Sequence, residues 1–426
     1  MHLRPTAGSP LLAVLQNKTF RPLWYVGGLG EISRRMELLV LSWLILTTTD
    51  SPFQLGLVLV FNNLPRPFLS LFTGLIADRF SRHRILVIAQ TINTLSASII
   101  LFLIAQDQIL TWHVFLAVFV QGATKSLEDP SRRTAIFDIV GDRHLVNALS
   151  LDTISNTAGK MIGPLLGGAL LDVSGFSGAY IFALIIHFLA LAVLTQVRIP
   201  VSATNSGQTE NVWHSLKVSV GYAFHSPMLL GMLYVTLVMN ALAFPVQQFI
   251  PAVGRDHLGV GATLVGLLVA AEEIGQLAGA GLMALSQNLR YHGRVFFFGS
   301  VIVLVIVILF VWSPWYAVSF AILTIGGVGQ AGFGTMQSAI TLMGAPKEMR
   351  GRMMGLMSVC IGIGTPLGTL EIGAVASAFS TQWALSLNAL AGLILIIPAL
   401  LLSPLVWQRS ANPPSQPAVK LGSDSD

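Results

Sequence analysis

Residues 74–84, GLIADRFSRHR, gather an acid and several basic side chains between two long apolar runs. Elsewhere charge is scarce, because only 10% of the 426 residues are charged and 54% are hydrophobic. The mean hydropathy is +0.73. Soluble globular chains are about 25% charged, and a water-soluble fold could not hide so much apolar surface. We therefore expect an all-α integral membrane protein in which residues 74–84 form a tight loop at the membrane surface.

Twelve apolar runs are long enough for helices that span a bilayer, which need about 20 residues each. They cover residues 20–47, 53–77, 85–105, 112–134, 146–171, 179–198, 216–250, 262–285, 295–312, 315–343, 353–378 and 382–405. The seventh and tenth are long, and we expect them to be tilted or broken. Pro245 and Pro251 mark the end of the seventh, and glycines between 326 and 334 loosen the tenth.

The basic residues predict the orientation. The N-terminal stretch lacks the long apolar segment and small-residue cleavage site of a signal peptide, so we expect it to stay in the cytoplasm. Most of the 24 Lys and Arg residues then fall on the cytoplasmic side, and Arg255 lies in a short external loop. Positive residues resist export during insertion. We expect a multi-pass protein of the inner (plasma) membrane with both termini in the cytoplasm.

Two halves of the chain echo each other across its longest polar break, residues 199–215. Pro164 lies in GKMIGPLLGGALLD (159–172), and Pro366 lies at the matching place in GIGTPLGTLEIGA (362–374). We expect two pseudo-symmetric six-helix bundles, at 1–198 and 216–405, joined by a cytoplasmic linker at 199–215. The segment 406–426 is expected to be a disordered cytoplasmic tail. Such repeats suit alternating access around a site near the bilayer midplane.

Two motifs resemble signatures of the major facilitator superfamily of secondary transporters. The loop at 74–84 is similar to G-x-x-x-D-R-x-G-R-[RK], although Ser81 and His83 replace two of its residues. The matching positions are Gly74, Asp78, Arg79 and Arg82, with Arg84 just beyond. Residues 159–170 are similar to the antiporter signature G-x-x-x-G-P-x-x-G-G-x-L. The matching positions are Gly159, Gly163, Pro164, Gly167, Gly168 and Leu170.

The resemblance covers residues 18–405 and implies a major facilitator fold of twelve helices. The stretches TFRPLWYVGGLGEISRR (19–35) and DPSRRTAIFDIVGDRH (129–144) look like the branch of macrolide-efflux and enterobactin-exporter proteins. The resemblance implies that the loop is a cytoplasmic gate, in which Asp78 faces the positive N-terminus of the eleventh helix. The glycines of the fifth helix share one face, where backbones can approach closely. Ordinary close helix packing is the alternative interpretation of that motif.

Ionisable residues inside the expected spans are costly to insert and are functional candidates. Burial disfavours the charged form of a carboxylate and a nearby guanidinium favours it, so such groups can bind and release a proton. Our candidates for proton coupling are Glu31, Glu37, Glu128 and Asp129. Their expected charge partners are Arg34, Arg35, Lys125 and Lys160. Further buried acids are expected at Glu272, Glu273 and Glu371. A permanent ion-pair network that only fixes packing is the alternative.

In the superfamily, helices 1, 4, 7 and 10 line the central cavity. The candidates for substrate contacts in the second half are therefore Tyr234, Asn240, Gln247 and Gln337. Met and Phe side chains beside them suit a bulky amphipathic substrate, although they are more often plain packing. GVGQAG (327–332) lacks the strand and the βαβ unit that a nucleotide-binding motif needs. We interpret His113 and His187 as packed or interfacial side chains, not as metal ligands.

The sequence therefore predicts a proton-coupled exporter of a hydrophobic or amphipathic small molecule, such as a drug, a macrolide or a siderophore-like compound. An uptake carrier of the same fold is the main alternative, and a polytopic membrane sensor or enzyme is a third. We expect no enzymatic activity, no cofactor, no metal and no nucleic-acid partner. The expected partners are the substrate, the proton and the lipid bilayer, and the expected state is a monomer.

Overall fold

All regular structure in the described part of the computed structural model is helical. The described residues are 14–66, 69, 81–197, 212–285, 291–346 and 349–407. The first bundle contains α2 (Phe20–Thr49), α3 (Pro52–Asn63), α5 (Arg82–Ala105) and α6 (Thr111–Gln196). α3 begins at a proline in its first turn, and the Ser51 hydroxyl accepts a hydrogen bond from the Gln54 amide.

Two glycines divide α6 into three helices that cross the bundle in turn. Gly141 and Gly175 both have a φ of 67°, a left-handed conformation that only glycine adopts easily. The first segment (111–140), the middle segment (142–174) and the last segment (176–196) correspond to the expected fourth, fifth and sixth spans. Each segment is a few residues longer than, or shifted from, its expected bounds, since the glycines and not the charged residues end the helices.

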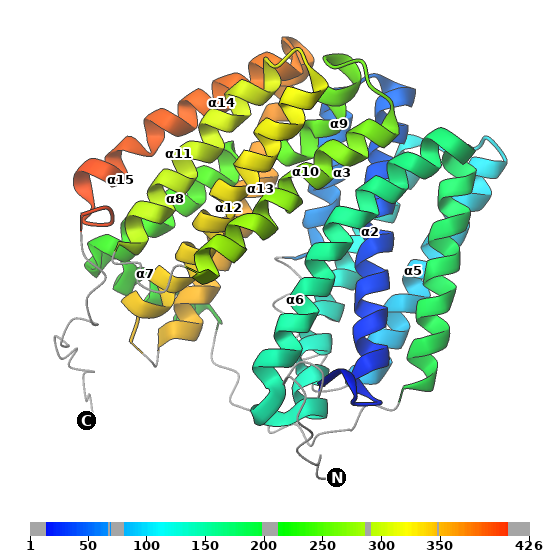
Figure 1. The fold of residues 1–426 in the computed structure, drawn as a ribbon, viewed down its shortest axis with the longest axis horizontal. Coiled ribbons are helices and arrows are strands. Elements are labelled where there is room, and N and C mark those ends of the chain that lie inside the picture. Colours follow the sequence, from blue (N-terminus) through cyan, green and yellow to red (C-terminus); the bar gives the residue numbers. More distant parts are fainter. Residues whose placement is uncertain are drawn as a thin grey trace.

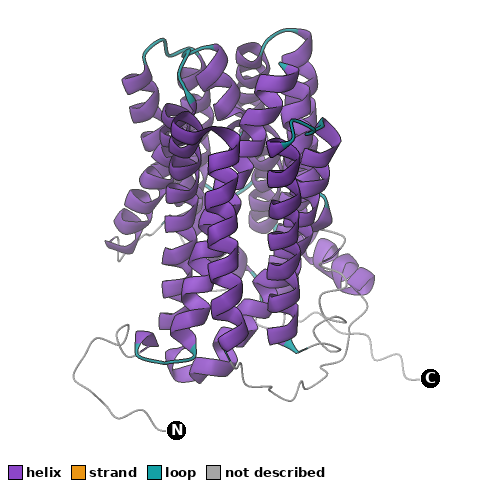
Figure 2. Ribbon diagram, turned by 90° about the vertical axis from the view of Figure 1, so that its right-hand side faces the viewer, coloured by secondary structure: helices purple, strands orange, loops and turns teal. Residues whose placement is uncertain are grey.

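The second bundle contains the remaining helices. They are α7 (Val212–His225), α8 (Pro227–Leu242), α9 (Val246–Asp256), α10 (Ala262–Leu285), α11 (His292–Val311), α12 (Tyr316–Gly344), α13 (Arg350–Ala378), α14 (Thr381–Leu395) and α15 (Ile397–Leu402). Figure 2 shows that the helices run side by side along the molecule, with loops at its two ends.

The expected break of the seventh span, 216–250, is confirmed. The span is interrupted before Pro227 and again before α9, because proline cannot donate a backbone hydrogen bond. Several other expected boundaries are wrong. α7 already begins at Val212, inside the expected linker. The tenth span is one unbroken helix, α12, whose glycines allow close packing: a Cβ on Gly329 would lie 2.9 Å from Ile302 Cγ2 of α11. The expected tail begins too early, because Val406 is buried and its carbonyl accepts a hydrogen bond from Arg294.

The outer surface fits a lipid environment. Eight helices of the described part are long and apolar enough to cross a membrane. On α5 the exposed apolar side chains recur at helical spacing and form one stripe. They are Ile88, Ile92, Leu95, Ile99 and Phe102. α2 and the first segment of α6 are not among the eight apolar helices. They instead carry charged residues in their middle turns.

The helices of the two bundles converge at one end of the molecule and separate toward the other end (Figure 1). At the convergent end α3 packs on α13 so closely that a Cβ on Gly56 would lie 3.1 Å from the Thr369 carbonyl oxygen. The middle segment of α6 packs on α10 in the same way. We call this contact region the closed end, and the opposite end, where the described helices separate, the open end.

Candidate functional site

Glu31 is the centre of an ion-pair network inside the first bundle. Only 1% of it is exposed, and three cations contact its carboxylate. Arg34 Nη2 lies 3.0 Å from Oε2, Arg35 Nε lies 2.9 Å from Oε1, and Lys125 Nζ lies 2.8 Å from Oε2. The two arginines follow from the i,i+3 and i,i+4 spacing on α2. Lys125 comes from the first segment of α6, so the network joins two helices.

The network continues through Arg34 to Glu128. Arg34 Nη1 lies 2.9 Å from Glu128 Oε2, and both side chains are buried. A second buried pair, Arg132 with Asp152, has a longer distance of 3.4 Å between Nη1 and Oδ1. Asp129 is half-buried and has no ion pair with any described side chain. The carboxylate charges of Glu31 and Glu128 are thus each paired with at least one cation, whereas that of Asp129 is not.

Glu37 lies in a separate buried cluster that contains no Lys or Arg. His187 Nε2 lies 2.6 Å from Glu37 Oε1, and the Ser33 hydroxyl donates to the same oxygen at 2.9 Å. Gln121 Nε2 donates to Oε2 at 2.6 Å. Glu37 and His187 are each 2% exposed. The sequence analysis missed this role of His187, because 150 residues separate it from Glu37 and nothing in the local spacing links them.

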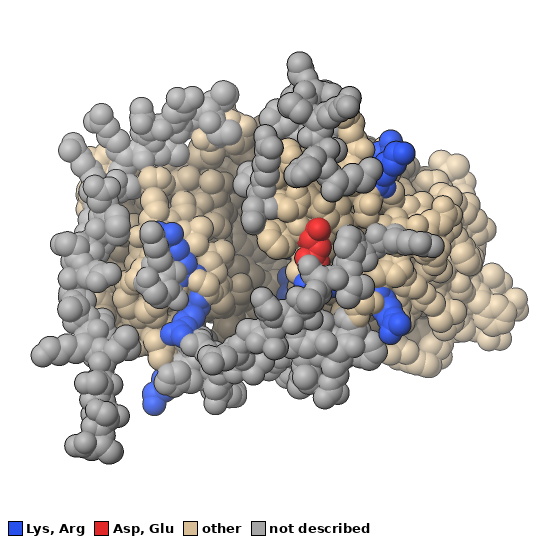
Figure 3. Space-filling view, turned by 90° about the horizontal axis from the view of Figure 1, so that it is seen from below, with Lys and Arg blue, Asp and Glu red and all other residues tan. Residues whose placement is uncertain are grey.

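A cavity of about 80 Å³ lies between the bundles, and both bundles contribute charged side chains to its walls. Arg35 and Lys160 line it from the first bundle, and Glu272 and Glu273 line it from the second. Lys160 Nζ and Glu273 Oε1 are 3.9 Å apart, beyond hydrogen-bonding distance, so this pair across the interface is loose. In the space-filling view from the open end, the molecule is hollowed between its two halves (Figure 3).

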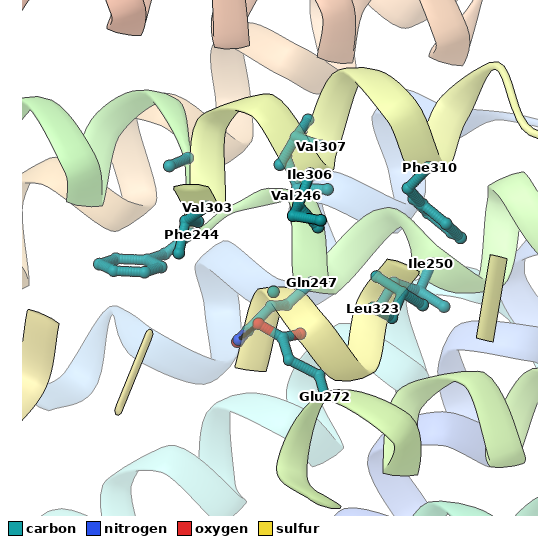
Figure 4. A pocket seen from close by; sticks show the side chains of 12 residues that line it. Phe244, Val246, Gln247, Ile250, Glu272, Val303, Ile306, Val307, Phe310 and Leu323 are labelled. Carbon is teal, nitrogen blue, oxygen red and sulfur yellow. Dashed lines mark hydrogen bonds between the residues drawn. The ribbon is translucent and has the colours of Figure 1, made fainter. Parts of the chain in front are cut away.

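Gln247 holds the carboxylate of Glu272 at the cavity wall. Its Nε2 donates to Glu272 Oε1 at 2.5 Å and to Gln330 Oε1 of α12 at 3.0 Å. Figure 4 shows the two side chains side by side at the edge of a smaller apolar pocket. That pocket, of about 20 Å³, is large enough for about one water molecule. Glu272 has no cation within ion-pair distance in the described part of the chain.

The four predicted substrate contacts of the second half do not form one cluster. Gln247 lines the cavity between the bundles. The Tyr234 hydroxyl instead donates to the Leu395 carbonyl of α14 at 2.7 Å, away from α9 and α10. Asn240 and Gln337 are buried inside the second bundle, where each bonds to Thr236. Tyr234 and Asn240 face different neighbours because of their separation along α8, and Gln247 and Gln337 belong to α9 and α12.

Glu371 was expected to be buried, and this is wrong. Its side chain is exposed on α13 and accepts a hydrogen bond from Asn388 Nδ2 of α14 at 2.5 Å. Glu273 is largely inside the protein, as expected, with 13% of its side chain exposed. The structure adds that it faces Lys160 of the first bundle. The sequence pattern gives the depth of an acid in a span but not the direction in which it points.

The predicted gate loop is only partly described. Gly74, Asp78 and Arg79 lie outside the described residues. Arg82 begins α5 and pairs with Asp138 of the first segment of α6, within its own bundle. Arg84 is exposed. The role of this loop as a gate stays a prediction.

The glycines of the antiporter-like motif pack the middle segment of α6 against α2. A Cβ on Gly159 would lie 2.8 Å from Glu31 Cβ, and one on Gly163 would lie 2.7 Å from the Ile32 carbonyl oxygen. Gly167 meets Met36 one turn further on. On the opposite face, Gly168 meets α10, as does the carbonyl oxygen of Pro164. The motif therefore lies between the buried network on one side and the second bundle on the other.

Two polar contacts join the bundles at the closed end, and the sequence analysis assigned neither. Asp172 Oδ2 accepts a hydrogen bond from the Thr263 amide at 2.8 Å, in the first turn of α10. A carboxylate is favourable at a helix N-terminus. Arg255 contacts the Leu46 carbonyl and the Asp50 carboxylate at the end of α2. Asp172 and Asp50 both lie near helix ends, where acids are common. Their positions in the sequence therefore did not indicate a contact between the bundles.

The model of the transmembrane secretion effector family, part of the major facilitator superfamily, matches residues 9–420. The chain belongs to this family. It is 25% identical over 243 residues to the uncharacterized MFS-type transporter YfiS of Bacillus subtilis (strain 168), covering 54% of this chain and 55% of the relative. It is 23% identical over 257 residues to the staphyloferrin A transporter of Staphylococcus aureus (strain NCTC 8325 / PS 47), covering 60% and 64%. The matches thus span between half and two thirds of these relatives.

Solved structures show the same fold. A bacterial homologue of the human lysosomal transporter Spinster has a TM-score of 0.69 at 14% identity, covering 94% of this chain and 97% of that one. The nucleoside transporter NupG has a TM-score of 0.68 at 14% identity, covering 90% and 98%. The expected all-α major facilitator fold is confirmed, as is membership of the superfamily. The resemblance to the macrolide-efflux and enterobactin-exporter branch stays a prediction.

Proposed function

We propose that this member of the transmembrane secretion effector family is a proton-coupled secondary transporter that exports a charged, siderophore-like small molecule. The observation that carries the proposal is the cavity between the bundles, with cations on one wall and carboxylates on the other. Closure at one end and separation at the other is the arrangement that alternating access requires. The basic residues of the sequence support a location in the inner membrane, with the open end toward the cytoplasm.

The free donors of the first bundle favour a substrate that carries a carboxylate. Arg35 uses its Nε to contact Glu31, and its terminal amino groups have no partner among the described residues. Its side chain is 35% exposed and lines the cavity, as does the loosely paired Lys160. A guanidinium fork matches a carboxylate in bidentate geometry. Glu272 and Gln247 on the opposite wall would accept hydrogen bonds from amine or hydroxyl groups of the same molecule.

The charged walls favour a siderophore-like compound over a neutral drug or macrolide among the three classes that the sequence suggests. The relative named as a staphyloferrin A transporter supports this choice. The antiporter-like motif at 159–170 favours export over uptake, which is the alternative direction. The cavity, at about 80 Å³, is smaller than a drug-sized site of roughly 300–1,000 Å³, so substrate binding would need the bundles to separate further.

The proposal is tested in liposomes that have an acidic lumen and contain a pH-sensitive dye. Carboxylate siderophores, catecholate siderophores, macrolides and cationic dyes are added outside, one at a time. An exporter that exchanges substrate for protons will release protons from the lumen as the compound accumulates inside. A proton symporter would instead carry protons into the lumen together with the compound, which would reverse the proposed direction. No proton movement in either direction with any compound would contradict proton coupling.

Substrate charge is tested with Arg35→Gln and Lys160→Gln. Loss of one charged hydrogen bond costs about 1.5–3 kcal/mol. Each variant should therefore bind a carboxylate compound roughly 10 to 100 times more weakly in a tryptophan-fluorescence titration. Lys217→Gln, at an exposed position on α7, is the matched control. Equal affinity of wild type and both variants for every carboxylate compound would exclude this binding mode.

A further inference from the structure

Glu37 and His187 form a buried acid–base pair that the sequence analysis did not connect. We infer that this pair is the proton-binding site of the transporter, and that the Glu31 network beside it is a fixed scaffold. The inference rests on the proposed proton coupling and identifies the groups that carry it. Of the four acids selected from the sequence, Glu37 takes part in proton exchange, Glu31 and Glu128 stay paired, and Asp129 has neither role.

The hydrogen bonds of Gln90 determine where the imidazole proton lies. Gln90 Nε2 is 3.1 Å from the His187 carbonyl oxygen, so this atom must be the amide nitrogen, because two oxygens would repel. The same nitrogen is 3.0 Å from His187 Nδ1, which therefore accepts a hydrogen bond. The ring proton is then on Nε2 and is donated to Glu37. The pair consists of an ionised carboxylate and a neutral imidazole.

One additional proton neutralises this pair. The proton binds to Nδ1 of His187 once Gln90 turns its amide, and the Glu37 carboxylate at Nε2 stabilises the resulting imidazolium. No covalent bond between heavy atoms changes. All donors to Glu37 in this structure are neutral groups, from Ser33, Gln121 and His187. Protonation therefore leaves no cation without a partner. Protonation of Glu31 would instead weaken the binding of three cations at once.

Most charged residues in the middle of the packed helices are already engaged. On α2 these are Glu31 and Arg34, and on the first segment of α6 they are Lys125 and Glu128, all within the ion-pair network. Asp129, on the same segment, has no ion pair with a described side chain. α5 brings the neutral Gln90, and its described titratable residues lie at its start, at 82–84. The middle segment of α6 faces α2 with glycines.

The last segment of α6 adds one more group. Tyr180 is 1% exposed and lies within the electrostatic range of Glu37. Its hydroxyl has no hydrogen-bond partner among the described residues. An unpartnered buried hydroxyl is costly to keep. It can serve as a second acceptor or donor when the proton on the pair moves.

α2 connects this pair to the substrate cavity. Arg35 lines the cavity between the bundles, and Ser33 and Glu37 lie two residues away on either side of it. Residues two apart on a helix point in different directions. The same two turns of α2 therefore contact the cavity on one face and the acid–base pair on the other. A shift of α2 on substrate binding changes the hydrogen bonds around Glu37. It thereby changes the affinity of the acid–base pair for a proton.

The test measures proton release when a transported compound binds to purified protein in weakly buffered detergent solution with a pH indicator. His187→Gln keeps an amide donor near Glu37 but cannot take up a proton in this range, and Glu37→Gln removes the carboxylate. Both variants should release at least about tenfold less proton per bound substrate than wild type. His225→Gln, at an exposed position on α7, should match wild type.

The outcomes separate this inference from the proposed function. Release by folded His187→Gln or Glu37→Gln at the wild-type level would overturn the proton site while leaving proton-coupled export intact. Absence of release from wild type itself would contradict the coupling. Solid-state NMR of ¹⁵N-histidine-labelled wild type gives a readout without a variant at the pair: substrate should change the protonation of one of the nine histidines. Tyr180→Phe should alter that signal. Nine unchanged signals would refute the inference.

Discussion

Replacement of Glu31 by glutamine tests whether the buried network holds the first bundle together. The substitution keeps the volume of the side chain but removes the charge that contacts Arg34, Arg35 and Lys125. Arg34 keeps Glu128 as a partner, whereas Lys125 loses its only ion pair in the described part of the chain. Removal of one partner of a buried ion pair costs about 3–5 kcal/mol. With about 2–4 °C lost per kcal/mol, the melting temperature should fall by on the order of 10 °C.

The assay is thermal unfolding in detergent, followed by tryptophan fluorescence. Trp24 reports on the first bundle, because its indole donates to the Leu151 carbonyl of α6. Asp129→Asn is the matched control, since this acid has no ion pair with a described side chain, and its melting temperature should change little. Replacement of both Glu31 and Lys125 by neutral residues should cost less than the sum of the single changes. A Glu31→Gln protein as stable as Asp129→Asn would refute the structural role of the network.

Two further substitutions test the packing and the closed end. Gly163→Ala should destabilise the protein by about 1–3 kcal/mol and slow transport, because the new methyl group would lie 2.7 Å from the Ile32 carbonyl oxygen. Gly355→Ala is the control, since nothing lies within 4 Å of the new methyl group. Its melting temperature should be unchanged or slightly higher. Asp172→Ala should weaken closure of the two bundles by about 1 kcal/mol, because the N-terminus of α10 loses its capping carboxylate. The labelling reporter is a cysteine in place of Ser42, which lines the cavity, in a Cys360→Ser background. A reagent that enters from the closed end should alkylate this cysteine about five times faster in Asp172→Ala. Asp107→Asn, at an exposed turn of the first bundle, is the control for that labelling rate, and equal rates in both variants would contradict the role of Asp172.

Local spacing predicts some of these contacts and not others. The pairs of Glu31 with Arg34 and Arg35 follow from the helical period of α2, and the charge-poor surroundings mark them as buried. Lys125 is 94 residues from Glu31, so only the packing of α6 on α2 brings them together. The fold class follows from composition and apolar run length, because lipid allows few architectures for a chain of this kind.

Direction around a helix is the information that the sequence lacks. Tyr234 and Gln337 lie on helices expected to line the cavity, yet their polar atoms bond inside the second bundle. His187 is an isolated histidine in an apolar run, and its acid partner lies on α2. In a membrane helix, apolar residues face both lipid and protein, so the hydrophobic pattern marks the faces poorly. The break at Pro245 was visible because proline acts through the backbone alone.

Transport by alternating access requires the two bundles to separate at the closed end. A disulfide between cysteines at Phe53 and Gly373 tests it most directly, since a Cβ on Gly373 would lie 3.2 Å from Phe53 Cα, within the range that a disulfide can span. In a Cys360→Ser background, oxidation should abolish transport of an identified compound, reduction should restore it, and neither single cysteine should respond. Full transport by the completely cross-linked protein would contradict alternating access between these bundles.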